Sequence, residues 1–237
     1  MKILLIIPAY NEQESIVPVI EHLTANFPQY EYVIVNDGSR DGTARICREH
    51  GYRMVDQPIN LGLAGAVQTG MKYAWMNDFD AAIQFDADGQ HLPEYIEPMA
   101  GKLREGYDIV IGSRFVTQKK PLTLRMVGSH LISLAIRLTT GQRIADPTSG
   151  MRIYNRRMIR EMAMEINCAP EPDTIAYLIR RGARVGEVQV EMRERIAGSS
   201  YLNLFRSMLY MVQMAFSILI VQWFRGKNQF KGAEEGK

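Results

Sequence analysis

Short apolar runs alternate with helical patterns along the first half of the chain. The apolar runs are typical of buried strands and lie at Ile3–Ile7, Tyr32–Asn36, Arg53–Val55, Ala81–Phe85 and Asp108–Ile111. Segments with helical periodicity separate them, at Gln13–Asn26, Gly42–His50, Ala64–Met76 and Pro93–Arg104. Strands that alternate with helices form parallel sheets covered by helices. The pattern therefore predicts an α/β fold with a mostly parallel central sheet.

The alternation is less regular after residue 115. A polar stretch, Thr117–Pro121, comes before a predicted helix at Leu124–Thr139, and a turn cluster, Asp146–Gly150, comes before a predicted strand at Met151–Tyr154. Helices are predicted at Arg156–Met164 and Thr174–Arg181, and a last strand at Arg184–Met192. We expect residues 1–200 to form one domain and residues 201–237 to form an amphipathic helix with a basic tail.

The residues from Ser207 to Phe224 carry no charge and would form a helix about 27 Å long. At 100° per residue they divide into an apolar arc and a polar arc. The apolar arc holds Met208, Leu209, Val212, Ala215, Phe216, Leu219, Ile220 and Trp223. This pattern favours a helix that lies at a membrane surface or on a small membrane protein through residues 202–225. A core-packing helix and a true membrane span are the alternatives.

Composition and charge narrow the class of protein. The chain has 237 residues, of which 46% are hydrophobic and 23% charged, as in globular proteins with a buried core. Its two cysteines, Cys47 and Cys168, exclude a disulfide scaffold and favour a reducing, cytoplasmic setting. Residues 1–192 hold 21 basic and 23 acidic residues, so the main body lacks the basic stripe of a nucleic-acid-binding protein. We expect no nucleic-acid partner.

Polar and acidic side chains follow three of the predicted strands. These segments are Pro8–Glu12, Asn36–Gly42 and Asp86–His91. In open parallel sheets, ligands bind beyond the carboxyl ends of the strands, where these segments would meet. Carboxylates gathered at one edge repel each other, and a divalent cation offsets that repulsion. The sequence therefore predicts a metal-assisted nucleotide site at this edge.

Asp86 and Asp88 are alternate residues at a strand end, so both can face one cation. Gln90 adds a neutral oxygen ligand. A solvated turn is the alternative interpretation of this spacing. His91 is interpreted as a polar neighbour of the acidic cluster, because Mg²⁺ and Ca²⁺ prefer oxygen ligands.

The segment Asp37–Gly42 has the spacing of the first half of a calcium-binding loop. The twelfth position of that loop is Arg48, where a bidentate glutamate is required, so a calcium site is excluded. A helix start explains the segment better, with Ser39 or Asp41 as the capping residue. Asp37, at the strand end, can then accept hydrogen bonds from a base or a ribose. A purely capping role is the alternative.

Two further groups of residues are candidates for contact with an acceptor. Glu171 and Asp173 lie just before a predicted helix, where they can cap the helix or act as a general base toward an acceptor hydroxyl. Several arginines follow strands or turns and are suited to bidentate contact with phosphate, although a surface position explains each of them equally. These are Arg114, Arg125, Arg152, Arg193 and Arg195.

Taken in order, these motifs resemble the family 2 glycosyltransferases of the GT-A fold over residues 2–195. The motifs with the family's order and spacing are Ile7–Glu12, Val35–Ser39 with Asp41–Thr43, Asn60-x-Gly62, Asp86–Pro93, Gly112–Arg114 and Asp146–Gly150. The resemblance implies a GT-A, nucleotide-diphospho-sugar transferase fold over residues 1–200. It also implies that the first domain is the catalytic one.

The resemblance also implies roles for individual residues. The nucleotide would be held by Pro8, Ala9, Tyr10, Glu12, Asp37 and Asp86. Asp88 and Gln90 would hold Mg²⁺ or Mn²⁺ on the diphosphate, where the metal stabilises the leaving group. An acceptor would attack the anomeric carbon from the opposite face and invert it.

Within the family, the chain most resembles the polyprenyl-phosphate transferases related to dolichol-phosphate mannose synthase. The residues that carry this likeness are Gln90-His91, Ser113-Arg114 and Arg195-x-x-Gly198-x-Ser200. A lipid phosphate is already anionic, so that branch needs no general base, and Arg114, Arg125 and Arg195 would position the phosphate. Arg152 and Ser200 are further expected contacts. Tyr201 follows Ser200 where those synthases usually have lysine.

We therefore expect inverting, metal-dependent transfer from a UDP- or GDP-sugar to a polyprenyl phosphate. The expected location is the cytoplasmic face of the plasma membrane, and the expected pathway is cell-envelope polysaccharide synthesis. One alternative is transfer to a sugar hydroxyl of a lipid-linked oligosaccharide, with Asp173 as the catalytic base. A second alternative is an inactive scaffold that recruits a membrane partner through its tail helix.

Overall fold

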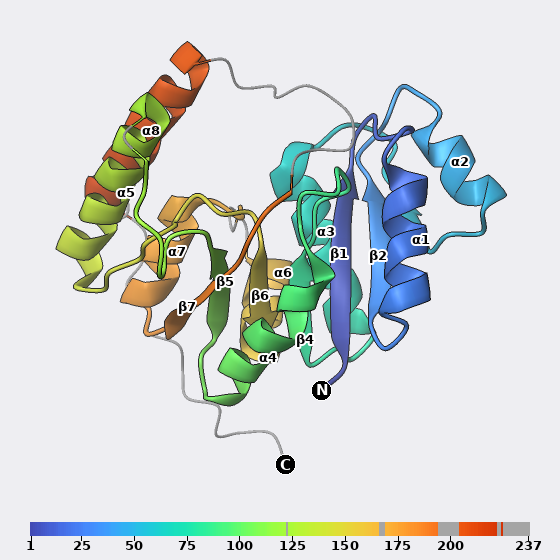
Figure 1. Ribbon diagram of the computed structural model, residues 1–237, viewed down its shortest axis with the longest axis horizontal. Coiled ribbons are helices and arrows are strands. Elements are labelled where there is room, and N and C mark those ends of the chain that lie inside the picture. The colour runs from blue at the N-terminus through green and yellow to red at the C-terminus, as the bar shows by residue number, and fades with distance from the viewer. Residues whose placement is uncertain (122, 166–168, 194–203, 222–223, 225–237) are drawn as a thin grey trace.

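The structure is a computed structural model that describes residues 1–121, 123–165, 169–193, 204–221 and 224. Strands and helices alternate as the apolar pattern predicts (Figure 1). The strands are β1 (Ile3–Ala9), β2 (Glu31–Asn36), β3 (Met54–Asp56), β4 (Ala81–Gln84), β5 (Ile109–Ser113), β6 (Arg152–Asn155) and β7 (Val185–Gln189). The helices are α1 (Ile16–Asn26), α2 (Thr43–Glu49), α3 (Gly62–Met76), η1 (Pro93–Tyr95), α4 (Ile96–Arg104), α5 (Leu124–Thr140), α6 (Arg156–Met164), α7 (Pro172–Arg180) and α8 (Leu204–Leu219).

The described strands form one sheet in the order β3-β2-β1-β4-β6-β5-β7. All pairings are parallel except those of β6, which runs antiparallel to both β4 and β5. The register of β1 on β2 places Ala9 opposite Asn36, so these two strands end side by side. The reversed direction of β6 brings its first residue, Arg152, opposite Gln84 at the end of β4.

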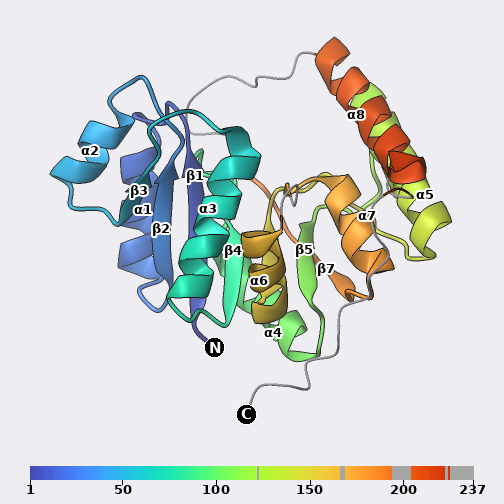
Figure 2. The same cartoon turned by 180° about the vertical axis from the view of Figure 1, so that it is seen from behind.

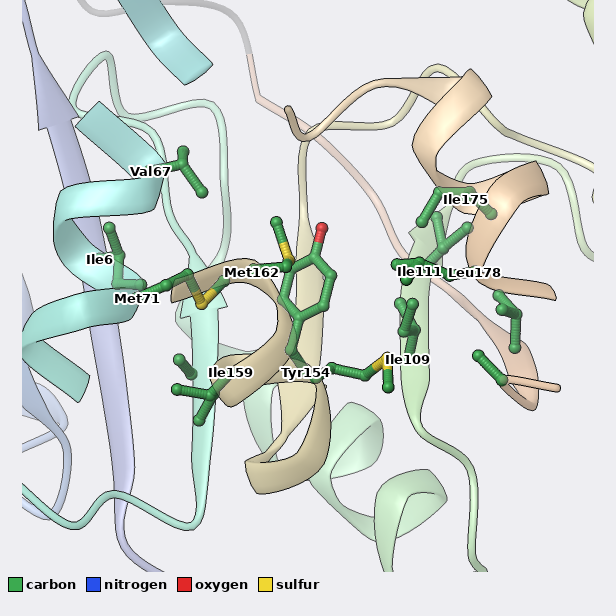
Figure 3. Close-up of a cluster of buried hydrophobic side chains, with 14 of the residues drawn as sticks. Ile6, Val67, Met71, Ile109, Ile111, Tyr154, Ile159, Met162, Ile175 and Leu178 are labelled. Carbon is green, nitrogen blue, oxygen red and sulfur yellow. The ribbon is translucent and has the colours of Figure 1, made fainter. Parts of the chain in front are cut away.

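Side chains alternate between the two faces of the sheet, and helices cover both faces. Ile3, Leu5 and Ile7 of β1 pack under α1 and α4, whereas Leu4 and Ile6 pack under the helices of the other face. Figure 2 shows α3, α6 and α7 in front of the sheet on that second face. Figure 3 shows part of the core beneath them, where side chains from α3, α6 and α7 meet those of β1, β5 and β6.

Helices α5 and α8 lie side by side at one end of the molecule, beyond the β7 edge (Figures 1 and 2). Gly128 of α5 allows the close approach, because a Cβ at this position would collide with the side chain of Met211 in α8. Met211, Ala215 and Ile218 of α8 are buried in the core. One face of α8 therefore packs as a core helix does.

The opposite face of α8 remains exposed. Its exposed apolar residues are Met208, Leu209, Val212, Phe216 and Leu219, and three residues after the helix, Ile220, Val221 and Phe224, are exposed as well. Most of the predicted apolar arc is thus solvent-facing, and among its described residues only Ala215 is buried. Trp223 lies outside the described residues. Within the described part of the chain, no helix has both the length and the apolar character needed to cross a bilayer.

Candidate active site

The carboxyl ends of β1, β2 and β4 lie next to one another at one edge of the sheet. Ala9 pairs with Asn36, and Ile6 of β1 pairs with Gln84 of β4. The backbone N–H of Asp37 donates to the carbonyl of Ala9 over 2.8 Å, so the pairing continues past the end of β2. The predicted convergence of these strand ends is confirmed.

The loop after β1 is bonded to the loop after β2. The N–H of Asn11 donates to Ser39 Oγ over 3.0 Å, and the N–H of Arg40 donates back to Asn11 Oδ1 over 2.8 Å. The N–H of Glu12 donates to Thr43 Oγ1 over 2.8 Å. Asn11 has φ of 57°, which asparagine tolerates better than most residues. These bonds hold together the two loops that contain Tyr10 and Asp37.

Asp37 is buried and joins the end of β2 to the turn before α3. Its Oδ1 accepts from the N–H of Leu61 over 2.7 Å, and its carbonyl accepts from Asn60 Nδ2 over 3.1 Å. The next residue, Gly38, has φ of 64°, and a Cβ there would lie 2.6 Å from the backbone nitrogen of Asn60. The segment at Asn60 is therefore a tight turn held by Asp37.

Asp41 caps α2 from just outside the helix. Its Oδ1 accepts from the backbone N–H of Thr43 over 3.0 Å and from the Thr43 hydroxyl over 2.6 Å. Of the two predicted capping residues, Asp41 therefore has this role. Ser39 instead bonds to Asn11 in the neighbouring loop.

Asp86 is held by His91, which is buried with 4% of its surface exposed. His91 Nδ1 accepts from the backbone N–H of Asp86 over 3.0 Å, and His91 Nε2 lies 3.5 Å from Asp86 Oδ2. Gln84 Nε2 lies 3.4 Å from Asp86 Oδ1. The expected role of His91 as a polar neighbour of the acidic cluster agrees with this geometry. The carboxylate of Asp86 keeps about a third of its side chain exposed.

Asp88 lies in the turn that follows Asp86. Its Oδ1 accepts from the N–H of Gln90 over 3.0 Å, and Gly89 has φ of 79°, which favours glycine. Gln90 also exchanges bonds with Arg193 beyond β7: the N–H of Arg193 donates to the Gln90 carbonyl over 3.1 Å, and Gln90 Nε2 lies 3.4 Å from the Arg193 carbonyl. The turn is therefore fixed at both ends.

The acidic edge gathers oxygen atoms of carboxylate and amide side chains. Gln84 Oε1 is buried beside Asp86 and has no hydrogen-bond partner among the described residues. Within this part of the chain, no three His, Cys, Asp or Glu side chains are grouped as a metal site. The carboxylate oxygens of Asp86 and Asp88 are of the kind that an oxygen-ligated cation prefers, with further ligands supplied by a bound molecule or water.

The turn at residues 146–150 lies between Asp86 of the acidic edge and Arg114. Asp146, with none of its side chain exposed, receives two bonds from Arg114, with Nε 2.7 Å from Oδ2 and Nη2 2.9 Å from Oδ1. Ser149 Oγ donates to the carbonyl of Gly112. A Cβ built on Gly150 would lie 3.5 Å from Asp86 Oδ2. The turn thus lies directly beside Asp86.

Comparison with known proteins agrees with this geometry. A sequence profile described as glycosyl transferase family 2 matches residues 4–163, more than half of the chain. The chain belongs to glycosyl transferase family 2. It is a glycosyltransferase, and the matched residues run from β1 to α6.

Relatives of this family 2 glycosyltransferase come from the branch that its motifs predict. Undecaprenyl-phosphate mannosyltransferase of Micrococcus luteus is 30% identical over 215 residues, which cover 86% of this chain and 88% of the relative. Polyprenol monophosphomannose synthase of Mycolicibacterium smegmatis is 28% identical over 213 residues, which cover 84% of this chain and 80% of the relative. The predicted resemblance to polyprenyl-phosphate sugar transferases is confirmed.

A solved structure shows the fold of this glycosyltransferase. Glucosyl-3-phosphoglycerate synthase from Mycobacterium tuberculosis, in complex with Mn²⁺, UDP-glucose and phosphoglyceric acid, matches it with a TM-score of 0.69. The sequence identity is 18%, and the match covers 92% of this chain and 79% of the other. The predicted GT-A fold is confirmed.

The arginines predicted to contact the acceptor differ in where this glycosyltransferase places them. Arg114 is paired with Asp146. Arg152 is 1% exposed, and its Nε and Nη2 donate to the carbonyls of Ser149 and Pro147 over 2.9 and 2.8 Å. Its Nη1 is buried without a partner among the described residues. Arg152 therefore stabilises the 146–150 turn in this structure, and its contact with an acceptor phosphate stays a prediction.

Other predicted acceptor residues lie outside what the structure describes. Arg195 and Ser200 belong to the undescribed residues, and the backbone of Arg125 lies in the first turn of α5 while its side chain is not described. Their roles stay predictions. The nucleotide and metal residues, by contrast, are all described and lie at the ends of β1, β2 and β4.

The two carboxylates at the start of α7 face α8 of the glycosyltransferase. The Tyr210 hydroxyl donates to Glu171, and Ser217 Oγ donates to Asp173 Oδ2 over 2.8 Å. Burial raises the pKa of Glu171, and the Tyr210 hydrogen bond and the charge of Arg152 partly offset this effect. The sequence pattern did not predict these contacts from α8. Their signal was the two hydroxyl-bearing residues Tyr210 and Ser217, which are seven positions apart and thus share one face of the helix.

Proposed function

We propose that the protein transfers a sugar from a nucleoside-diphosphate sugar to a polyprenyl phosphate. The observation that carries this proposal is the pair of carboxylates, Asp86 and Asp88, beside the joined loops after β1 and β2. The named activities of the two bacterial relatives support the choice of a polyprenyl-phosphate acceptor. A peripheral location at the cytoplasmic face of the plasma membrane follows from a lipid acceptor and belongs to the same proposal.

The donor would lie along the edge formed by the ends of β1, β2 and β4. We assign the nucleotide to Pro8, Ala9, Tyr10, Glu12, Asp37 and Asp86. Asp37 has one carboxylate oxygen fixed by Leu61, which orients the group for contact with the base or ribose. The bonds between Asn11, Ser39 and Arg40 order the surrounding loops before the nucleotide binds.

Asp88, with Asp86 and Gln90 beside it, would hold a divalent cation on the diphosphate. Mg²⁺ and Mn²⁺ both accept such oxygen ligands. When bound, the metal supplies Lewis-acid stabilisation of the negative charge that develops on the departing diphosphate. His91 keeps Asp86 oriented through the bond to its backbone N–H, so the carboxylate needs little rearrangement when the donor arrives.

The acceptor would attack the anomeric carbon on the side opposite the diphosphate and invert it. A phosphate oxygen is anionic at neutral pH and needs no proton acceptor, so Arg114, Arg125 and Arg195 would orient it by charge. Arg152 supports the same region from beneath by holding the carbonyls of the 146–150 turn. Ser200 is assigned as a further contact of this phosphate.

Transfer to a sugar hydroxyl, with Asp173 as general base, is the alternative. Asp173 accepts a hydrogen bond from Ser217 over 2.8 Å, which orients its carboxyl group. Asp173→Asn distinguishes the two acceptors. It should abolish transfer to a hydroxyl and leave transfer to a phosphate within about threefold of the native rate.

Product analysis tests the proposal directly. The full chain in detergent is incubated with Mn²⁺, labelled UDP- and GDP-sugars, and undecaprenyl phosphate present or absent. A labelled lipid that is labile to mild acid is the expected product. Label that enters the lipid phase only with a lipid-linked saccharide would contradict the phosphate acceptor.

Asp88→Asn is the variant that tests the metal assignment, and Asp78→Asn is its control. Asp78 is exposed on the surface and has φ of 55°, a conformation that asparagine also adopts, so this exchange removes a charge without strain. We expect Asp88→Asn to lower turnover at least about 100-fold and Asp78→Asn to leave it unchanged. Metal-independent nucleotide binding by calorimetry would contradict the metal assignment. No binding with any metal would favour the inactive scaffold.

A further inference from the structure

A fully buried arginine lies beneath the 146–150 turn. Arg152, the first residue of β6, is 1% exposed, and two of its side-chain nitrogens donate to the carbonyls of Ser149 and Pro147. Its third nitrogen, Nη1, is buried, and the described residues provide neither a hydrogen-bond partner for Nη1 nor a carboxylate within ion-pair distance of the guanidinium. A guanidinium keeps its proton in proteins, so this buried positive charge requires a balancing charge from farther away.

Glu171 is a source of that balancing charge. It directly precedes α7, the helix that lies between the sheet and α8 in Figures 1 and 2. Burial raises the pKa of its carboxyl group, while the Tyr210 hydrogen bond and the positive charge of Arg152 act in the opposite direction. Burial also raises the pKa of the Tyr210 hydroxyl, and the charge of Arg152 acts against that shift too. The three side chains, from three different elements, therefore lie within electrostatic reach of one another.

Tyr210 fixes the position of the Glu171 carboxylate. Its hydroxyl donates to Glu171, and its raised pKa keeps the proton on Tyr210, so this hydroxyl stays a donor. Asp173, on the same helix as Glu171, is the other charge that acts on Glu171. No described ionisable side chain of α5, which also packs against α7, does so. Glu171 therefore faces a hydroxyl from α8 and a positive charge from β6.

The negative charge of Glu171 makes the fold less stable. Because burial raises its pKa, the folded chain holds the Glu171 proton more tightly than the unfolded chain does, so ionisation lowers the free energy of unfolding. A neutral side chain of the same shape would avoid this loss. Ionisable groups with perturbed pKa values that reduce stability are typical of functional positions. The position of Glu171 therefore favours a functional role over a structural one.

The turn that Arg152 holds borders the proposed donor site. A Cβ built on Gly150 would lie 3.5 Å from Asp86 Oδ2. In the sheet, Arg152 is opposite Gln84, whose Nε2 lies 3.4 Å from Asp86 Oδ1. Without the negative charge of Glu171, the guanidinium would be drawn toward water or another carboxylate and would lose its bonds to the turn. The position of the turn beside Asp86 therefore depends on that charge.

We propose that ionised Glu171, held by Tyr210, is the counter-charge of Arg152, and that Glu171 and Tyr210 are thereby positioning residues for sugar transfer. Neither residue touches a substrate in this proposal, because both act through Arg152 and the 146–150 turn. Glycosyl transfer is the activity of the family, and the inference rests on the proposed function only for the donor and the acceptor used in the assay.

Hydrogen exchange of the full chain tests the proposal without any substrate. The Ser149 N–H donates to the Asp146 carbonyl over 3.2 Å, so its exchange reports whether the turn is held. At mildly alkaline pH, we expect Glu171→Gln to accelerate exchange in a peptide spanning residues 146–150 by about 10-fold. Its thermal unfolding midpoint should equal or exceed that of the native chain, which a purely structural role would not predict. Native exchange at the turn would overturn the proposal.

Tyr210→Phe and Ser217→Ala form a matched pair for the same measurement. Each removes one hydroxyl of α8 that donates to a carboxylate of the α7 region, from Tyr210 to Glu171 and from Ser217 to Asp173. Near neutral pH we expect faster exchange at the turn in Tyr210→Phe and native exchange in Ser217→Ala. Equal acceleration in both variants would mean that any loosening of α8 disturbs the turn, and it would overturn the role of Glu171.

The pH dependence of turnover separates charge from packing. Turnover is measured in neutral detergent with Mn²⁺, labelled UDP- or GDP-sugar and undecaprenyl phosphate. Tyr210→Phe removes a hydrogen bond that lowers the pKa of Glu171, so the acid limb of its profile should move to higher pH and turnover should recover at alkaline pH. An acid limb at the native position would overturn the proposal.

Glu171→Gln completes the kinetic test. This variant cannot acquire the negative charge, so its turnover should be lower by about 10-fold or more across the whole pH range. Its KM for the nucleotide sugar should stay within about twofold of the native value, because the loops after β1 and β2 are unchanged. Native turnover in Glu171→Gln would overturn the proposal. Faster exchange at the turn would support it even if undecaprenyl phosphate were not the acceptor, so its failure is distinguished from failure of the proposed function.

Discussion

Replacement of His91 by alanine tests how Asp86 is held. His91 Nδ1 accepts from the partly buried N–H of Asp86 over 3.0 Å, and the imidazole packs edge-on against Phe85 with ring centres 5.6 Å apart. Loss of the acceptor leaves that N–H unsatisfied, which costs about 1–3 kcal/mol. The carboxylate of Asp86 also loses its neighbour Nε2, 3.5 Å away. Removal of residues that orient metal ligands weakens metal binding by about 10–100-fold.

The expected result for His91→Ala is a chain that folds, is less stable by about 2 kcal/mol or more, and needs about 10–100-fold more Mn²⁺ for half-maximal nucleotide binding. Calorimetric titration of UDP and of GDP at several Mn²⁺ concentrations measures the metal requirement, and urea unfolding measures the stability. His91→Asn retains an acceptor near the position of Nδ1, so its metal requirement should lie between those of the native chain and the alanine variant.

His22→Ala is the control for this experiment, because His22 is an exposed residue of α1 whose ring contacts only Phe27 among the described aromatic rings. It should bind nucleotide with the native dependence on Mn²⁺. If His91→Ala also kept the native dependence, within about twofold, His91 would not orient Asp86 and the reasoning would be wrong.

Further predictions concern the arginine pair, the helix pair and the pH dependence of stability. Arg114→Gln leaves the buried Asp146 carboxylate without its bidentate partner and should lower the free energy of unfolding by about 3–5 kcal/mol in urea titrations; a change below about 1 kcal/mol would contradict a structural role for the pair. Gly128→Leu inserts a side chain against Met211 and should separate α8 from α5, seen as faster proteolysis of α8 and unchanged proteolysis of α1. Burial raises the pKa of Glu171 above its ordinary value of 4.5, so the folded state holds this proton more tightly than the unfolded state does. Its contribution to stability is therefore greatest below pH 4.5 and decreases as the pH rises through the raised pKa, and Glu171→Gln should remove this decrease from the pH profile of thermal unfolding.

The alternation of apolar runs and helical patterns predicted most of the sheet. The bounds of strands β1, β2, β4 and β5 agree with the prediction to within about two residues, because buried strands of a parallel sheet are apolar on both faces. The last strand is shorter than predicted, ending at Gln189 instead of Met192. The antiparallel direction of β6 could not be predicted, since a strand's own sequence does not show which neighbours it will pair with.

The acidic edge could be predicted because each candidate nucleotide or metal residue lies at or after the end of a strand, and the carboxyl ends of parallel strands lie at the same edge of the sheet. The contacts that support it were not predictable, because they join residues distant in sequence. Arg114 and Asp146 are 32 positions apart, and Gln90 and Arg193 are 103 positions apart. The sequence marked Gln90, Arg114 and Arg193 as candidates for chemistry, whereas the structure shows that the side chains of Arg114 and Arg152 are bonded within the fold.

The orientation of helix α8 about its own axis decides which of its residues contact α7 and which face outward. Tyr210 and Ser217 bond to Glu171 and Asp173 on one side, and Val212 and Phe216 face outward. Each residue advances a helix by 100°, so one inserted or deleted residue between Tyr210 and Phe216 would turn one set of contacts away. The length of this helix is therefore as constrained as its composition.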